Sequence, residues 1–162
     1  MTKMVRFGGV LALTVLALAA AQSQAHAQAA IRSLPGYGGK AYFAAEGNCF
    51  HDSQGAVVSD CNARYWFIPL DIALPTTATA PSIFVYRPST SVNVGCQTYA
   101  ASADNLTVVT QPSMVYATVT GSSTIYPGTV GVSGKTFHLF EFCYMDAGTM
   151  IYDVNWSATS VH

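Results

Sequence analysis

Short apolar and aromatic runs, each bounded by turn residues, follow one another along most of the chain. Their residue types favour extended backbone, and no segment after residue 28 has the 3.6-residue period of an amphipathic helix. We expect strands over residues 40–46, 63–72, 83–87, 91–100, 106–110, 114–120, 136–145 and 150–157. About eight strands at this spacing predict an all-β fold: a single antiparallel two-sheet sandwich, jelly-roll-like or Ig-like, rather than a parallel α/β domain.

Alternation within these runs predicts which side chains point into the sandwich. In residues 91–100, Cys96 shares a face with Val94, whereas Tyr99 is out of phase and is expected on the outer side of its sheet. We expect residues 83–87 to pair with this strand around the turn Arg-Pro-Ser-Thr, and residues 121–135 to form a loop. In the last run the side chains expected to share one face are Met150, Tyr152, Val154 and Trp156.

The first 27 residues have the pattern of a secretory leader. Lys3 and Arg6 precede the uncharged run 10–21, and residues 25–27, Ala-His-Ala, supply a small-x-small cleavage site. A membrane-spanning helix needs about 20 apolar residues, and no later segment is long and apolar enough to span. We therefore interpret residues 1–27 as a signal peptide of bacterial type and residues 28–162 as one domain that is secreted to the periplasm or the exterior.

The remaining 135 residues carry few charges. They contain five Lys and Arg and eight Asp and Glu, which gives a formal net charge of −3. Charged residues are 9% of the whole chain, against about 25% in an average soluble domain. Nucleic acids and anionic membranes are bound through clustered cations, and five scattered ones form no such patch. The composition therefore excludes a nucleic-acid partner.

Four cysteines in an exported chain predict two disulfides. The sequence permits three pairings, and Cys49 with Cys61 is favoured because the residues between them have turn chemistry. Cys96 with Cys143 is then the second pair. On the chain-entropy model, loops of these lengths stabilise the fold by about 3 and about 4 kcal/mol.

The density of reactive side chains is highest around the first of these pairs, where His51 and Asp52 lie between Cys49 and Cys61. Structural zinc sites use closely spaced thiols, and the gap of 11 residues here fits them poorly. A catalytic thiolate must stay reduced, which a nearby partner cysteine opposes. We interpret the stretch as a disulfide-closed loop with His51 and Asp52 as solvated turn residues, and we predict no metal and no cofactor. A binding role for the two side chains stays open.

The leader, the early cysteine loop, the strand containing Tyr-Trp-Phe-Ile-Pro-Leu, the segment "VYRPSTSVNVGCQTY" and the closing "FEFCYMDAGTMIYDVNW" together resemble small exported bacterial β-sandwich proteins with paired cysteines. The resemblance covers most of residues 28–162. It implies the sandwich fold and no activity.

Glu141 is the polar residue that the pattern places most unusually. It shares a strand face with Leu139 and Cys143, where a carboxylate is costly unless it is hydrogen-bonded and where burial would raise its pKa. We expect a bulge or an edge position that lets it reach water or a backbone donor. No second carboxylate is spaced to form a glycosidase pair. Residues 128–136 approach a phosphate-binding loop but lack its first glycine.

Elimination leaves two main classes of function. The first is a secreted noncatalytic module that binds a glycan or a protein partner at the cell envelope, because nine tyrosines and two tryptophans can stack on sugars or apolar partners. The second is a structural or assembly protein of the envelope or matrix. A hydrolase is the least favoured class. The candidate contact residues are Tyr99, Tyr126, His51, Asp52 and Glu141.

Overall fold

A computed structural model describes residues 30–70, 81–102, 108–110, 113–128 and 137–158. Within these ranges nearly all regular structure is β-strand, and every strand pair is antiparallel. The expected leader (residues 1–27) and nearly all of the glycine-rich segment 128–136 lie outside the described residues. No helix in the described ranges is long and apolar enough to cross a membrane.

Twelve strands and two short 3-10 helices are described. They are β1 (Ala30–Pro35), η1 (Gly36–Gly38), β2 (Lys40–Ala41), η2 (Ala44–Cys49), β3 (Phe50–Ser53), β4 (Ala56–Ser59), β5 (Arg64–Leu70), β6 (Ser82–Arg87), β7 (Val94–Ser102), β8 (Val108–Thr110), β9 (Val115–Tyr116), β10 (Gly121–Ile125), β11 (Phe137–Met145) and β12 (Met150–Ala158).

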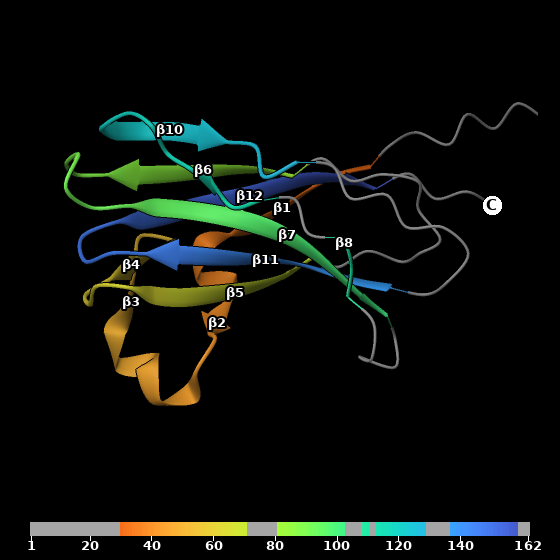
Figure 1. Ribbon diagram of the computed structural model, residues 1–162, viewed down its shortest axis with the longest axis horizontal. Coiled ribbons are helices and arrows are strands. Elements are labelled where there is room, and N and C mark those ends of the chain that lie inside the picture. Colours follow the sequence, from red (N-terminus) through yellow and green to blue (C-terminus); the bar gives the residue numbers. More distant parts are fainter. Residues whose placement is uncertain (1–29, 71–80, 103–107, 111–112, 129–136, 159–162) are drawn as a thin grey trace, which may run out of the picture.

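The strands form two sheets, which lie one over the other (Figure 1). The first sheet has the order β10-β6-β12-β4-β3, and β1 also pairs with β12. The second has the order β2-β5-β11-β7-β8, and β9 also pairs with β7. The hairpin β11–β12 thus gives each sheet its central strand. The predicted antiparallel two-sheet sandwich is confirmed, with more and shorter strands than expected.

The core lies between the sheets and is built by alternate residues of each strand. Strand β5 turns Trp66, Ile68 and Leu70 inward, and β6 turns Ile83 and Val85 to meet them. Removing such side chains from water is the main force that holds two sheets together, at about 25 cal/mol per Å² of apolar area.

Both predicted disulfides are confirmed. Cys96 and Cys143 occupy directly paired positions of β7 and β11. Cys49 and Cys61 flank the hairpin β3–β4, whose turn residues Gln54 and Gly55 have φ values of 54° and 91°, as a tight hairpin turn requires. The stretch expected as a loop is therefore a hairpin.

The expected pairing of residues 83–87 with 91–100 is wrong, because β6 and β7 belong to different sheets. The chain crosses between the sheets at residues 88–93, and the buried Arg87 holds this crossover. Its guanidinium donates to the carbonyl oxygens of Val92 (2.6 Å), Thr90 (2.8 Å) and Ala117 (3.2 Å).

Three further expectations on strands need correction. The expected first strand, 40–46, is a strand only at Lys40–Ala41 and continues as η2, while β1 was missed. Gly121–Ile125, expected within a loop, is strand β10. In β12 the register shifts between Ile151 and Asp153. Because of this bulge, Ile151 points inward with Val154, and Tyr152 lies on the outer side, where its ring is 5.0 Å from that of Phe84.

Candidate functional site

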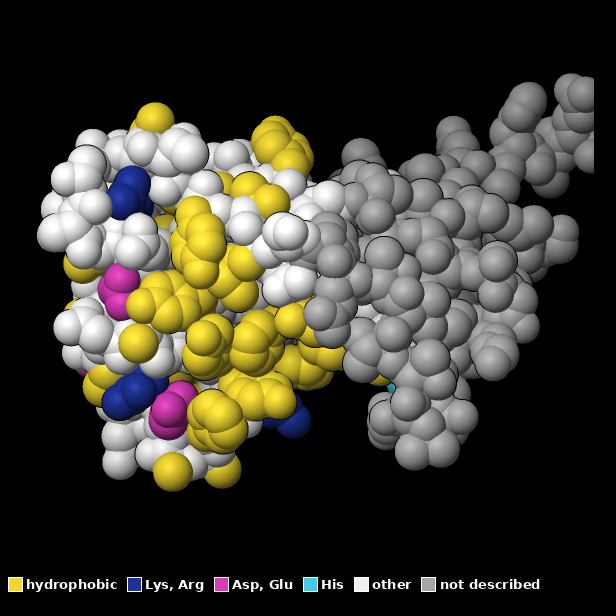
Figure 2. Space-filling view, viewed as in Figure 1, with side chains coloured by type: hydrophobic (Ala, Val, Ile, Leu, Met, Phe, Trp, Pro, Cys, Tyr) yellow, Lys and Arg dark blue, Asp and Glu magenta, His cyan; other side chains and the backbone are white. Residues whose placement is uncertain are grey.

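The outer side of the β2-β5-β11-β7-β8 sheet is covered by aromatic rings. It receives every second residue of the three long strands, and on β5 and β11 most of these residues are Phe or Tyr. Figure 2 shows the resulting apolar region, with charged side chains at its margin. We call it the aromatic face, and it consists of Tyr42, Phe43, Tyr65, Phe67, Tyr99, Tyr116, Phe140, Phe142 and Tyr144.

Ring contacts tie the aromatic face together across the strands. Tyr65 stacks on Phe142 with centroids 4.7 Å apart and an interplanar angle of 13°. Tyr99 stacks on Phe140 at 5.3 Å and 7°. Each such pair adds about 0.5–1.5 kcal/mol beyond the area it buries. The face is therefore a preformed surface that requires little ordering when a ligand arrives.

Tyr116 is the residue of this face whose setting best suits stacking on a ligand. Its ring covers Gly95 of β7: a Cβ atom on that glycine would lie 2.5 Å from Tyr116 Cδ1. The opposite side is open, since Tyr116 is 44% exposed. Its ring meets that of Tyr144 with centroids 6.1 Å apart. A glycine at position 95 thus lets an aromatic ring lie against the strand.

The polar groups of the aromatic face are neutral hydroxyls. Tyr144 donates to Asp146 Oδ1 at 2.9 Å, and Tyr99 donates to Gln97 Oε1 at 3.1 Å. Burial, with the hydrogen bond to Asp146 as the next cause, raises the pKa of Tyr144 to about 12. Charge is confined to the rim, where Arg64 lies 3.5 Å from Glu46 and Lys40 lies 5.6 Å from the centre of the Phe67 ring.

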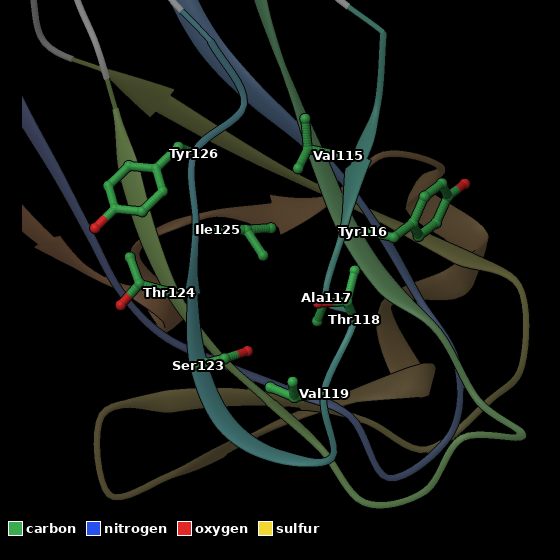
Figure 3. Close-up of a pocket in the computed structure, with 9 residues that line it drawn as sticks. All are labelled: Val115, Tyr116, Ala117, Thr118, Val119, Ser123, Thr124, Ile125 and Tyr126. Atoms are coloured by element: carbon green, nitrogen blue, oxygen red, sulfur yellow. The ribbon is translucent and has the colours of Figure 1, made fainter.

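A pocket of about 370 Å³ adjoins the aromatic face between residues 115–119 and β10. Figure 3 shows Ser123 and Ile125 pointing from β10 into the gap, while Tyr126 and Thr124 point to the other side of that strand. Across the gap, Tyr116 points away from the pocket. This residue is therefore the boundary between pocket and face.

The five predicted contact residues lie in four separate places. Tyr99 belongs to the aromatic face and is half-buried on the outer side of β7, as expected. Tyr126 borders the pocket beside β10 and is 67% exposed. His51 and Asp52 lie on strand β3 rather than in a turn, and Glu141 lies in the core.

His51 and Asp52 border a second pocket, of about 360 Å³, at the edge of the sandwich where β2 meets β3. Asp52 Oδ1 accepts a bond from the Gly55 amide at 3.0 Å, which holds the hairpin turn. His51 Nδ1 lies 2.7 Å from Asp60 Oδ2, and both side chains are about half exposed. In the described parts of the chain no three His, Cys, Asp or Glu side chains gather as metal ligands would.

The expectation that Glu141 sits at a bulge or an edge is wrong. Strand β11 pairs in unbroken register with β5 and with β7, and the side chain of Glu141 is 0% exposed. Its carboxyl group is hydrogen-bonded by the Thr98 hydroxyl at 2.8 Å. Burial raises its pKa to about 8, although the Thr98 bond acts in the opposite direction. This group is inside the sandwich and cannot touch a bound polymer.

Most of the aromatic face was missed from the sequence. The signal is present in "RYWFIPL" and "FHLFEFCYM", where both alternate sets are apolar or aromatic. Such runs are usually strands buried on both sides. Here the second set is half-buried by ring contacts among its own members and with Tyr99 of the neighbouring strand β7. These contacts can be recognised only once the neighbouring strands are known.

No family model and no curated protein sequence matches the chain. Among solved structures, a family GH115 4-O-methyl-α-glucuronidase with specificity for decorated arabinogalactans matches at TM-score 0.50 and 12% identity, over 81% of this chain and 18% of that one. The C-terminal CBM6 of a laminarinase from Zobellia galactanivorans matches at TM-score 0.43 and 14% identity, over 79% and 99%. The GH26-CBM35 β-(1,4)-mannanase of Podospora anserina matches at 0.44 and 13%, over 84% and 27%. The first likeness shows a shared β-sandwich fold.

Proposed function

We propose that this protein is a noncatalytic binding module that recognises a neutral polysaccharide through the aromatic face. The observation that carries the proposal is the open Tyr116 ring, which lies over Gly95 at the side of an uncharged, preformed aromatic surface. A pyranose ring has an apolar face that packs on an aromatic ring and hydroxyls that pair with neutral polar groups. The glucuronidase, 18% of whose chain shares the fold, has specificity for decorated arabinogalactans, so polysaccharides are the first ligands to test.

The two disulfides support a site of action outside the cytoplasm, because such bonds persist in oxidising compartments. Together with the leader-like residues 1–27, they support a secreted protein of the bacterial envelope or exterior. A polysaccharide of that environment is the ligand that we propose.

Affinity gel electrophoresis against a panel of neutral and of anionic polysaccharides tests the proposal, followed by calorimetric titration. We expect at least one neutral polymer to bind. Tyr116→Ala should weaken that binding about tenfold, the effect of losing about 1.4 kcal/mol. Tyr116→Phe should bind nearly as well as wild type, because it keeps the ring. Tyr99→Ala should also weaken binding.

Phe84→Ala is the matched control, because Phe84 is also an exposed aromatic residue (40%) but lies on the other sheet. It should bind as wild type does. The proposal is wrong if no neutral polymer is retarded, or if Tyr116→Ala and Tyr99→Ala both retain full affinity. Release of reducing sugar from a bound polymer would contradict the noncatalytic part.

The alternative to a polysaccharide is a protein partner bound to the aromatic face, because exposed apolar regions also mark protein–protein contacts. The stacked pairs Tyr65–Phe142 and Tyr99–Phe140 cover part of their own ring faces, which suits a flat apolar contact. Dimerisation measured by sedimentation and abolished by Tyr116→Ala, with no polysaccharide bound, would favour this function.

A further inference from the structure

The pocket beside the aromatic face holds a hydroxyl group that the fold does not use. Ser123 Oγ is buried and has no hydrogen-bond partner among the described residues. Figure 3 shows this oxygen pointing into the gap between β10 and residues 115–119. An unpaired buried polar group costs about 1–3 kcal/mol. A hydroxyl kept at such a cost is suited to a ligand that supplies its partner.

Most of the other side chains that face the pocket interior are apolar, and Thr118 adds a second hydroxyl to the lining. The apolar walls are formed by Val115, Ala117 and Val119 on one side and by Ile125 on the other. None of the lining residues is charged. The ligand group that fits must therefore be neutral and mainly apolar, and must carry one hydrogen-bond acceptor for Ser123.

We propose that the pocket binds an O-acyl substituent, acetyl being the smallest, on a sugar residue of the polysaccharide held by the aromatic face. The methyl group of the ester would pack on the apolar walls, and its carbonyl oxygen would accept the Ser123 hydroxyl. Tyr116 stands between the two surfaces, so the decorated residue lies next to the one that stacks on its ring. This inference rests on the proposed function and specifies its ligand as an acylated neutral glycan.

The Ser123 hydroxyl also lets the pocket discriminate between acetylated and deacetylated forms of the polysaccharide. The Ser123 hydroxyl is already unpaired in the free protein, so an acetylated chain gains a hydrogen bond that a deacetylated chain cannot form. A deacetylated chain also leaves the apolar walls in contact with water. Both effects favour the acetylated chain.

Each neutral polysaccharide of the panel is titrated in a partially O-acetylated form and again after mild alkaline deacetylation. We expect wild type to bind the acetylated form of its ligand about tenfold more tightly. Ser123→Ala should lose this preference while still binding the deacetylated form. Ser122→Ala, an exposed serine on the same strand, is the control and should keep the preference.

Thermal unfolding without ligand gives a second readout. Removing an unpaired buried hydroxyl should leave the melting temperature of Ser123→Ala unchanged or raise it. A melting temperature lowered by several degrees would show that the hydroxyl serves the fold, and would overturn the assignment.

The titrations separate this inference from the proposal on which it rests. Equal affinity for acetylated and deacetylated polymers, or a preference that persists in Ser123→Ala, overturns the acyl pocket and leaves the binding function standing. Absence of binding to every polymer in both forms overturns the binding function itself and the acyl pocket with it.

Discussion

Glu141 shows how one buried residue can make the stability of the whole sandwich depend on pH. Its carboxyl group lies between the sheets beside Thr98, and its pKa is about 8 in the folded protein against an ordinary value of 4.5. Between these two values the folded state binds the proton that the unfolded state has released. The free energy of unfolding must therefore decrease as the pH rises through this window.

We predict that the melting temperature of wild type falls between pH 5 and pH 9, and that Glu141→Gln removes most of this fall. Each pH unit of the window contributes about 1.4 kcal/mol, so the full change amounts to several kcal/mol. Glutamine keeps an acceptor for Thr98 and cannot ionise. Scanning calorimetry across the pH range measures the effect.

Glu46→Gln is the control for this series, because Glu46 pairs with Arg64 at the rim. It should keep the wild-type slope. A wild-type melting temperature that is constant or rises over the window would contradict the prediction.

Arg87 holds in place the segment that joins the two sheets. The crossover between β6 and β7 has no strand pairing within it, and the Arg87 guanidinium donates to carbonyls at Thr90, Val92 and Ala117.

Asp146 acts nearby as an acceptor for the amides of Ala63 and Asn93. Burial raises the pKa of Asp146, but these bonds outweigh burial and lower it below its ordinary value.

We predict that Arg87→Met lowers the free energy of unfolding by about 3 kcal/mol, because several buried carbonyls lose their donor. Arg87→Lys should recover less than half of this loss, since an ammonium group lacks the planar fork of donors. Urea unfolding measures both. Arg64→Lys, at the rim, is the control and should cost less than about 1 kcal/mol. If Arg87→Lys were as stable as wild type, the planar arrangement of guanidinium donors would not be needed, and the prediction would be wrong.

Alternation along a strand predicts which side chains point inward, but it does not predict which sheet the strand joins. The alternation along residues 91–100 correctly placed Cys96 inside and Tyr99 outside, because one strand with a period of two fixes its own faces. It could not place β6 and β7 in different sheets, since that choice depends on the distant partners β10 and β11. The bulge in β12, which reverses the phase of Tyr152, has no local signal either. Glu141 was misplaced because its partner, Thr98, lies on another strand.

At the scale of the whole molecule, the two disulfides constrain the unfolded chain to different extents. Cys49 and Cys61 are 12 residues apart, and Cys96 and Cys143 are 47 residues apart. We predict that replacing the first pair by alanine lowers the free energy of unfolding by about 3 kcal/mol, and the second pair by about 4 kcal/mol. Urea unfolding of the oxidised variants measures these losses. A larger loss for the first pair would contradict the loop-length argument.

The hairpin β11–β12 supplies the central strand of both sheets, and this arrangement determines when the protein can fold. Until residues 137–158 have left the ribosome, β5 and β7 have no strand between them, and β6 lacks the neighbour that joins it to β4. Contacts between distant segments also slow folding, because the chain must close long loops before they form. Neither sheet can therefore be completed until the hairpin β11–β12 has been synthesised, so the earlier strands wait for a late segment of the chain before they can form the sandwich.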